Sequence, residues 1–265
     1  MLDSSVEKFG SATAELVGRS AKGSEKLKSP IRISAVLPVY AEKESVVEVV
    51  SGLCTLVGDY LQEIILIVAK SSPAETLRIC EETVARFPLV RLSMQQHNPG
   101  LGLAVREGIA EARGTHILLM DSDGEMDVQT VPRMLTDLRK RDADLVVASR
   151  WVNGGGVEGY NRFKYILNRG YQFIFQLLYW TPIHDLTLGF KLGRAEVLKS
   201  IPWSAQFHDI GCETTLRVIR AGYTVTEVPT VWRCRKEGVS KNSFRRNFRY
   251  VWMALSILLR QTRNK

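Results

Sequence analysis

Short apolar runs alternate with longer stretches of helical periodicity between Ile31 and Ser149, and this alternation limits the fold more than any other feature. The apolar runs predict strands at 31–38, 63–69, 90–95, 116–121 and 144–149. The stretches between them predict helices at 42–57, 73–87, 102–114 and 128–141. Strands joined by helix-length crossovers form a mostly parallel sheet with helices on both faces, the arrangement of α/β proteins. Ligands bind beyond the carboxyl ends of such strands, so we expect the functional site there.

After Arg150 the alternation breaks. The glycine-rich connection "WVNGGGVEGY" leads into an aromatic-rich stretch at 161–180, which predicts a helix. Residues 207–229 then predict a helix followed by a strand. We see no internal repeat of the length that solenoid proteins use.

One large domain fits the length of 265 residues and the apolar content of 45% better than two small ones. Residues 1–30 are rich in Ser, Lys, Glu and Gly, so we expect a mobile leader before a domain at 31–242. There is no apolar signal core, and no apolar run approaches the roughly 20 residues of a membrane span. Four cysteines without a C-x-x-C pair are typical of reduced thiols. We therefore expect a cytoplasmic protein that is not integral to a membrane.

The C-terminal segment 243–265 is predicted to be a basic amphipathic helix. From Arg233 onward ten residues are basic and one is acidic, whereas the whole chain carries a formal charge of +8, so the basicity is local. One helical face collects apolar residues, namely Phe244, Phe248, Val251, Trp252, Leu255 and Leu259, and Arg245, Arg246 and Arg249 lie off it. Such a helix either packs on the domain or lies in an anionic membrane interface.

The fourth apolar run ends in the acidic stretch "MDSDGEMD". In an extended segment residues two apart point to the same side, so Asp121 and Asp123 can direct both carboxylates into one volume. A cation there would offset their repulsion, and ligation by oxygen alone favours Mg²⁺ or Mn²⁺. Glu125 can supply a third oxygen. The plain alternative is a solvated acidic turn after a strand.

Two further patterns suit a phosphorylated ligand. Gly100 and Gly102 stand where a helix begins, so backbone amides could approach a ligand closely, although a helix-entry turn explains them equally well. Downstream, "RCRKEGVSK" offers a set of cations and a hydroxyl that can clamp phosphate oxygens: Arg233, Arg235, Lys236, Ser240 and Lys241. Metal-binding acids together with a phosphate clamp indicate a diphosphate whose departure the site stabilises.

Six segments then carry a family resemblance. In order they are "AVLPVYAEKESV", "MDSDGEMD", "DLVVASRWVNGGGVEGY", "DLTLGFK", "GCETTLRVIRAGYTVTEVP" and "RKEGVSK". Their order and spacing resemble family 2 glycosyltransferases, and most of all the dolichol-phosphate (polyprenyl-phosphate) mannosyltransferase branch. The resemblance implies a GT-A fold, the nucleotide-diphospho-sugar transferase fold. It also implies a nucleotide-sugar donor, Mg²⁺ or Mn²⁺, and a polyprenyl-phosphate acceptor at the cytoplasmic face of a membrane.

The resemblance also implies roles for particular residues. The nucleotide-sugar site would comprise Pro38, Tyr40, Glu42, Val68, Lys70, Asp121, Ser122, Asp123, Arg235 and Lys241. The metal ligands would be Asp121, Asp123 and Glu125, the last in place of a usual Gln. Arg150, Lys164 and Asn168 would face the acceptor phosphate, where the family has Arg, Arg and Ser. Asp123, Arg235 and Lys241 would be the catalytic residues.

One segment departs from the family. After the second strand the family has Asp-Asp-Gly-Ser, whose carboxylate reads the nucleotide base, but here Ala69 and Lys70 stand in those places. A lysine cannot accept a hydrogen bond from a base N–H. The family's Asn after the Tyr is likewise replaced, by Ala41. The sequence therefore does not identify the sugar or the nucleotide. Two alternative hypotheses remain: a glycosyltransferase of the same fold with a soluble acceptor, and a non-catalytic relative.

The mechanism that we expect is a single displacement at the anomeric carbon with inversion. A lipid phosphate is already anionic at neutral pH, so no general base is needed, and Arg150 and Lys164 would orient it. Asp185 and Glu213 match family positions and could simply brace the site. The expected location is peripheral, at the inner face of the membrane, with a membrane-anchoring protein as a conceivable partner. Nucleic acid is not an expected partner, because the basic tail lacks a reader motif and the acidic cluster would repel a phosphate backbone.

Overall fold

The computed structural model describes residues 30–159, 162–234 and 244–261. Ile31–Lys265 form one compact unit. Residues 1–29 of the expected leader at 1–30 lie outside the described residues, as do the basic segment at 235–243 and the last four residues.

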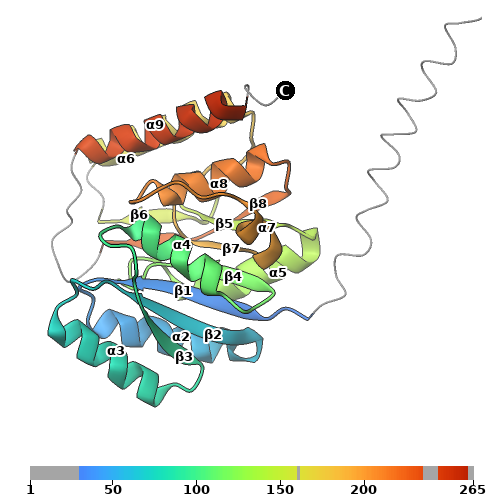
Figure 1. The fold of residues 1–265 in the computed structure, drawn as a ribbon. Helices are drawn as coiled ribbons and strands as arrows, with labels where there is room; N and C mark the ends of the chain where they lie inside the picture. Colours follow the sequence, from blue (N-terminus) through green and yellow to red (C-terminus); the bar gives the residue numbers. More distant parts are fainter. Residues whose placement is uncertain (1–29, 160–161, 235–243, 262–265) are drawn as a thin grey trace, which may run out of the picture. The chain divides into compact units, whose positions relative to one another are not determined.

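The centre of the unit is a seven-stranded sheet (Figure 1). Its strands are β1 (Ile33–Val39), β2 (Leu61–Val68), β3 (Val90–Met94), β4 (His116–Leu119), β5 (Leu145–Ser149), β7 (Lys191–Arg194) and β8 (Val225–Pro229). Their order across the sheet is β3-β2-β1-β4-β7-β5-β8. β7 is antiparallel to both neighbours, and the other neighbouring pairs are parallel. The expectation of a mostly parallel sheet is confirmed.

Helices cover both faces of this sheet. One face packs against α2 (Glu44–Val57), α3 (Ala74–Arg86) and α5 (Val131–Arg141). The other packs against α4 (Leu101–Glu111), α6 (Arg162–Tyr179), α7 (Ala195–Ser200), α8 (Ile210–Arg220) and α9 (Phe244–Gln261). Two 3₁₀ turns, η2 (Gly58–Tyr60) and η3 (Val128–Thr130), precede β2 and α5.

Strand alternation divides the core into two clusters. Ala35 and Leu37 of β1 join the cluster beneath α2, whereas Val36 joins the cluster beneath α4. All three are fully buried, because a strand inside such a sheet has no solvent-facing side. This is why the first, second, fourth and fifth strands read as nearly continuous apolar runs.

A small second sheet stands beside the carboxyl ends of the main strands. β6 (Gly156–Glu158) pairs in parallel with β9 (Val231–Arg233). The Arg233 amide donates to the Glu125 carbonyl at 2.8 Å, and Met126 forms an isolated bridge with Trp232. The acidic stretch after β4 is therefore held against β9, the strand that leads into the basic segment.

β7 was missed by the sequence analysis. Its four residues, Lys-Leu-Gly-Arg, contain neither an apolar run nor a period-two pattern. They nevertheless insert between β4 and β5, and Lys191 there is fully buried.

Candidate functional site

A cleft of about 2150 Å³ opens at the carboxyl ends of the parallel strands. The ends of β1, β2 and β3 bound one part of it with Tyr40, Ala69 and Gln95, and the segment after β4 contributes Asp121 through Met126. α6 and α8 bound the other part, with residues such as Asn168, Tyr171, Ile210 and Gly211. The cleft lies where an α/β sheet is expected to bind its ligand.

The acidic stretch is tied to β1 across the sheet edge. Ser122 donates from Oγ to the Pro38 carbonyl at 2.6 Å, so the ends of β4 and β1 are joined. Asp123 Oδ1 accepts from the Glu125 amide at 3.0 Å, which closes a turn around Gly124 at a φ of +74°. Asp121, Asp123 and Glu125 all line the cleft.

The structure does not gather these three carboxylates into one metal cage. Within residues 30–159, 162–234 and 244–261, no three His, Cys, Asp or Glu side chains meet closely enough to hold a metal ion. The expected set of Asp121, Asp123 and Glu125 is thus not preformed, because the turn directs Asp123 Oδ1 back to the Glu125 amide. Two aspartates after one strand still suit a hard ion, since Mg²⁺ and Mn²⁺ commonly take one or two carboxylates and fill the remaining positions with water and substrate phosphate.

The expected nucleotide residues divide into lining and supporting positions. Pro38, Tyr40 and Glu42 line the cleft, and the Glu42 carboxylate accepts from the backbone amides of Tyr40 at 2.6 Å and Ala41 at 3.0 Å. Val68 is fully buried in the core, so its neighbour Ala69 lines the cleft instead. Lys70 is exposed and donates from Nζ to the Gln96 carbonyl at 3.5 Å, beside the cleft lining.

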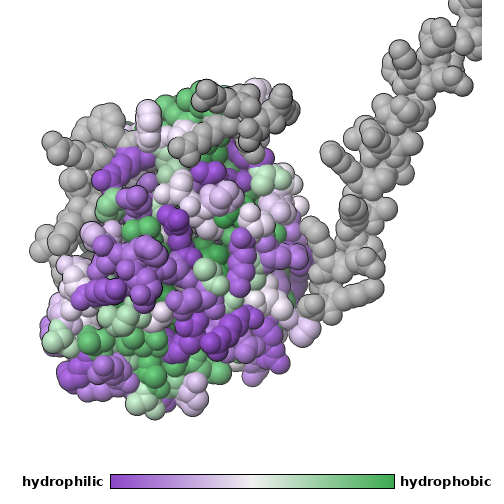
Figure 2. Space-filling model, in the orientation of Figure 1, coloured by the Kyte–Doolittle hydropathy of each residue, from purple (hydrophilic) through white to green (hydrophobic). Residues whose placement is uncertain are grey.

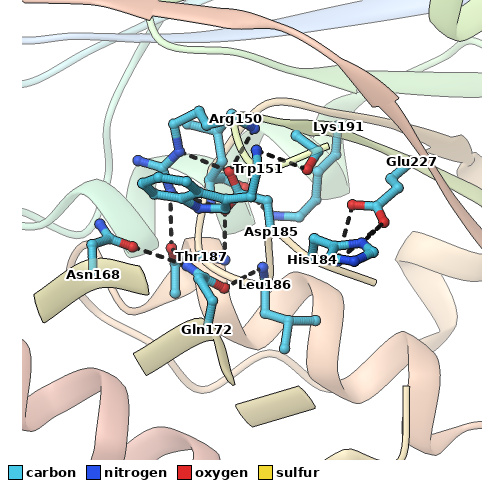
Figure 3. Close-up of polar contacts among 12 residues, drawn as sticks. Arg150, Trp151, Asn168, Gln172, His184, Asp185, Leu186, Thr187, Lys191 and Glu227 are labelled. Atoms are coloured by element: carbon cyan, nitrogen blue, oxygen red, sulfur yellow. Dashed lines mark hydrogen bonds and ion pairs between the residues drawn. The ribbon is translucent and has the colours of Figure 1, made fainter. Parts of the chain in front are cut away.

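A buried ion pair supports the α6 side of the cleft (Figure 3). Arg150 donates to Asp185 from Nε at 2.7 Å, from Nη2 at 2.9 Å and from its backbone amide at 3.0 Å. Arg150 is 8% exposed and Asp185 is fully buried. Burial alone would raise the pKa of Asp185, but the charge of Arg150 and these hydrogen bonds lower it below its ordinary value. The guanidinium of Arg150 is thus fixed in place at the wall of the cleft.

Polar side chains from α6 extend this network. Gln172 is fully buried and donates from Nε2 to Thr187 Oγ1 at 2.7 Å and to Asn168 Oδ1 at 3.1 Å. Thr187 Oγ1 also accepts from Arg150 Nη2 at 3.1 Å. Two of the expected acceptor residues, Arg150 and Asn168, are therefore linked and line the same cleft. Lys164 belongs to α6, but its side chain lies outside the described residues.

Lys191 is a supporting residue that the sequence analysis missed. Its side chain is fully buried, and Nζ donates to the carbonyls of Leu188 at 2.6 Å and Gly211 at 2.7 Å. Burial lowers its pKa to about 7, against an opposing effect of Asp185. Leu188 and Gly211 line the cleft, so Lys191 ties two of its walls together from beneath. A lysine inside an otherwise apolar stretch, "LGFKLG", was the available signal.

Gly102, at the start of α4, is taken up by packing, whereas Gly100 lines the cleft. The amides of Gly102 and Leu103 donate to the Gln206 carbonyl at 3.0 and 3.4 Å. A Cβ added at Gly102 would lie 2.6 Å from the Ala205 carbonyl oxygen. Glycine is required here because the segment containing Gln206 crosses the helix end.

Glu213 holds that crossing segment. Its buried carboxylate accepts from the backbone amides of Ser204 at 2.9 Å and Ala205 at 2.8 Å, and from Arg217 Nε at 2.7 Å. Asp185 and Glu213 therefore both brace the walls of the cleft, which was one of the readings left open.

The expected phosphate clamp falls mostly outside the described residues. Arg235 and Lys241 belong to the segment 235–243. Arg233, just before it, pairs with Glu158 at 3.1 Å and with Asp127 at 3.5 Å. The contact with Asp127 holds Arg233 next to the acidic stretch.

α6 and α9 expose a joint apolar surface. Tyr179 of α6 donates from Oη to the Ala254 carbonyl of α9 at 2.6 Å, which links the two helices. The exposed large apolar side chains are Tyr165, Ile166, Phe173, Ile174, Leu177 and Leu178 on α6, Trp180 directly after it, and Trp252, Leu255 and Leu259 on α9. Figure 2 shows hydrophobic residues at the end of the unit where Figure 1 draws these helices. No helix in the part of the chain that the structure describes is long and apolar enough to cross a membrane.

Comparison with known proteins agrees with this arrangement. Residues 34–201 match the family model described as glycosyl transferase family 2. A polyprenol monophosphomannose synthase of Mycolicibacterium smegmatis is 32% identical over 222 residues, 80% of this chain and 81% of that protein. A dolichol-phosphate mannosyltransferase of Pyrococcus furiosus is 26% identical over 225 residues, 83% of this chain. The match spans 62% of the Pyrococcus protein, so less than two thirds of that relative.

A solved structure shares the fold. Glucosyl-3-phosphoglycerate synthase of Mycobacterium tuberculosis, in complex with Mn²⁺, uridine diphosphate and phosphoglyceric acid, superposes with a TM-score of 0.64. It is 18% identical, and the match covers 86% of this chain and 77% of that one. The likeness confirms the expected GT-A fold.

Proposed function

The chain belongs to glycosyl transferase family 2, and from this premise we propose that it transfers a hexose from a nucleotide sugar to a polyprenyl phosphate with inversion at the anomeric carbon. The observation that carries the proposal is that Asp121 and Asp123, from the segment after β4, line the same cleft as Arg150 and Asn168. The relatives named as mannosyltransferase and monophosphomannose synthase support a polyprenyl-phosphate acceptor.

The donor would lie over the ends of β1, β2 and β4. Pro38, Tyr40 and Glu42 would contact the nucleoside, and Asp121, Ser122 and Asp123 would lie at its diphosphate. Asp121 and Asp123 would hold a divalent ion, with Glu125 near enough in sequence to join once the donor is bound. A bound Mg²⁺ or Mn²⁺ would neutralise charge on the leaving nucleoside diphosphate. The Mn²⁺ and uridine diphosphate in the mycobacterial structure are consistent with that choice.

Arg150 would position the acceptor phosphate. Because Asp185 takes up Nε and Nη2, the guanidinium has one orientation, and a phosphate would meet it without a rearrangement cost. Asn168 would add a polar contact from α6, and Lys164 a second charge. A phosphate oxygen of the lipid forms the bond to the anomeric carbon, and the bond from that carbon to the diphosphate oxygen breaks. The electron pair leaves on the nucleoside diphosphate, where Arg235 and Lys241 would stabilise it.

No residue needs to act as a general base in this scheme. The attacking phosphate oxygen is already anionic at neutral pH, so no proton has to be removed before the bond forms. The buried carboxylates near the cleft are consistent with this, since Asp185 and Glu213 are both taken up by structural hydrogen bonds.

The joint apolar surface of α6 and α9 would dock on a lipid surface. Ile166 is 70% exposed, Phe173 67%, and Trp180, directly after α6, 91%. Arginines at 162, 169 and 249 belong to α6 and α9. Apolar side chains beside cations suit the interface of an anionic membrane. Asn168 and Tyr171 of α6 line the cleft, so docking through this helix would bring the cleft to the lipid phosphate.

Transfer is tested by incubating the protein with labelled nucleotide sugars, Mn²⁺ and a short polyprenyl phosphate, followed by organic extraction. We expect the label in the organic phase with at least one donor. Label that stays in a water-soluble product would instead indicate a soluble acceptor, and the absence of transfer with every donor would indicate a non-catalytic relative.

Docking is tested separately by flotation with liposomes that contain anionic lipid. We expect the protein to float and the triple variant Ile166→Ser, Phe173→Ser, Leu177→Ser to remain at the bottom. The matched control is Leu89→Ser, which removes an exposed leucine elsewhere on the domain and should float as the wild type does. A triple variant that floats equally well would contradict docking through α6.

A further inference from the structure

The proposed donor site lacks an obvious reader for the nucleotide base. Ala69 stands at the end of β2 and lines the cleft, but a methyl side chain can neither donate nor accept a hydrogen bond. Lys70, the next residue, can only donate. A base placed over the ends of β1, β2 and β3 would therefore need its hydrogen-bond acceptor from another element.

Gln95, at the end of the neighbouring strand β3, has a side chain that could supply such an acceptor. It directly follows β3, and its backbone amide donates to the Val68 carbonyl at 2.8 Å, which places it beside Ala69. Its side chain lines the cleft and is only 2% exposed. A buried amide in the wall of a cleft is costly unless both of its ends are matched.

The orientation of this amide is determined by its surroundings. Nε2 donates to the His97 carbonyl at 2.6 Å and to the Gly100 carbonyl at 3.0 Å. The reverse orientation would place Oε1 against both carbonyl oxygens, so the amide cannot flip without losing two hydrogen bonds. Oε1 is then the end that remains for a ligand, and no described residue donates a hydrogen bond to it.

The loop that holds the amide is itself rigidly supported. The amides of Gln96 and His97 donate to the two oxygens of Glu107 at 2.8 and 2.7 Å, and the His97 ring approaches the same carboxylate at 2.8 Å. Burial would raise the pKa of Glu107, but these hydrogen bonds lower it. Because the loop is tied to α4, Oε1 is in place before any ligand arrives.

We propose that Gln95 selects the nucleobase of the donor by accepting, at Oε1, the ring N–H of an imide-type base. This inference rests on the proposed function, since it assumes that the cleft binds a nucleotide sugar. Uracil offers N3–H and guanine N1–H, whereas cytosine and adenine present a lone pair at the corresponding ring nitrogen. A ring nitrogen with a lone pair would be repelled by Oε1. A site built to accept a hydrogen bond from a ring N–H therefore rejects bases without that N–H.

The test uses nucleoside diphosphates whose ring N–H is replaced by N–CH₃. Calorimetry with Mn²⁺ would compare uridine diphosphate with its N3-methyl analogue, and guanosine diphosphate with its N1-methyl analogue, on the wild-type protein. For the base that binds more tightly, we expect methylation to weaken binding by about 10- to 100-fold. The wild type should likewise prefer that base over cytidine and adenosine diphosphates.

A variant separates a direct contact from a steric or structural effect. In Gln95→Met, which keeps the length of the side chain, the parent and methylated diphosphates should bind within about threefold of each other. A merely structural disturbance would weaken both equally and leave their ratio unchanged. Gln96→Ala is the matched control: it removes the adjacent, exposed glutamine and should retain the wild-type ratio.

Three results would overturn the inference. If the wild type binds parent and methylated diphosphates equally, or if Gln95→Met keeps the full discrimination, Gln95 does not read the base and the proposed function is untouched. If no nucleoside diphosphate binds at all, the proposed function fails together with the inference. The wild-type comparison needs no variant, so it decides the matter even if Gln95→Met does not fold.

Discussion

Removing Asp185 should destabilise the protein far more than removing a carboxylate from a surface ion pair. Asp185 is fully buried and accepts three hydrogen bonds from Arg150 as well as one from the Leu188 amide at 3.2 Å. In Asp185→Ala the side chain of Arg150, which is only 8% exposed, would lose its main counter-ion. Breaking such a pair costs about 3–5 kcal/mol, a large part of the roughly 5–15 kcal/mol by which a protein is stable.

The assay is urea unfolding at pH 7, with Glu82→Ala as the control. Glu82 pairs with Arg78 at 2.6 Å, but both side chains are about three-fifths exposed, so its loss should cost less than about 1 kcal/mol. The double variant Arg150→Met, Asp185→Leu should recover part of the loss, because it buries no unpaired charge. If Asp185→Ala costs no more than Glu82→Ala, the network does not hold the cleft as we describe.

The same pair gives a pH dependence. The pKa of Asp185 is lowered in the folded protein from an ordinary value of 3.8. Its contribution to stability is therefore complete above about pH 4 and is lost as the pH falls through the lower folded value. The difference in unfolding free energy between the wild type and Asp185→Ala should shrink below pH 4, and a constant difference would contradict the ionised pair.

Three further predictions follow from other parts of the cleft. Asp123→Asn should reduce sugar transfer by at least about 100-fold while thermal unfolding stays within a few degrees of the wild type, whereas retained transfer would remove Asp123 from the metal site. Gly102→Ala should lower the unfolding free energy in urea by about 1–3 kcal/mol, because its Cβ would lie 2.6 Å from the Ala205 carbonyl oxygen, and an unchanged midpoint would show that the crossing segment moves freely. Between pH 7 and 9.5 Lys191 is protonated in the unfolded chain but largely not in the folded protein, where its pKa is about 7, so its contribution to the unfolding free energy increases with pH. The unfolding free energy of Lys191→Met should therefore rise less across that range than that of the wild type, and an equal rise would contradict the lowered pKa.

Most strands of the sheet could be predicted from local hydrophobic patterns in the sequence. The apolar runs that became β1, β2, β4 and β5 are buried on both faces, which leaves a continuous hydrophobic signal in the sequence. The resemblance to family 2 glycosyltransferases and the GT-A fold were also confirmed. β7 escaped prediction because its place in the sheet depends on a buried lysine whose hydrogen bonds reach the Leu188 carbonyl and the Gly211 carbonyl, the latter twenty residues away on α8. A local pattern does not encode that second contact.

The site was predictable where chemistry follows directly from a strand end and not where it depends on tertiary partners. Asp121 and Asp123 were placed at the cleft by the strand that precedes them. The glycines at the start of α4 were ambiguous, because their purpose is set by Gln206, about a hundred residues away. Gln95 gave no signal at all, since a glutamine after a strand acquires meaning only from the carbonyls that orient its amide.

The central claim is that Asp121 and Asp123 hold a divalent ion against the diphosphate of a nucleotide sugar, and calorimetric titration of Mn²⁺ tests it most directly. With a saturating nucleoside diphosphate present, we expect one Mn²⁺ to bind per chain, and the variant Asp121→Asn, Asp123→Asn to lose that binding while it remains folded. Failure of the wild type to bind Mn²⁺ beyond what the free diphosphate captures, or full retention of binding by the double variant, would contradict the account.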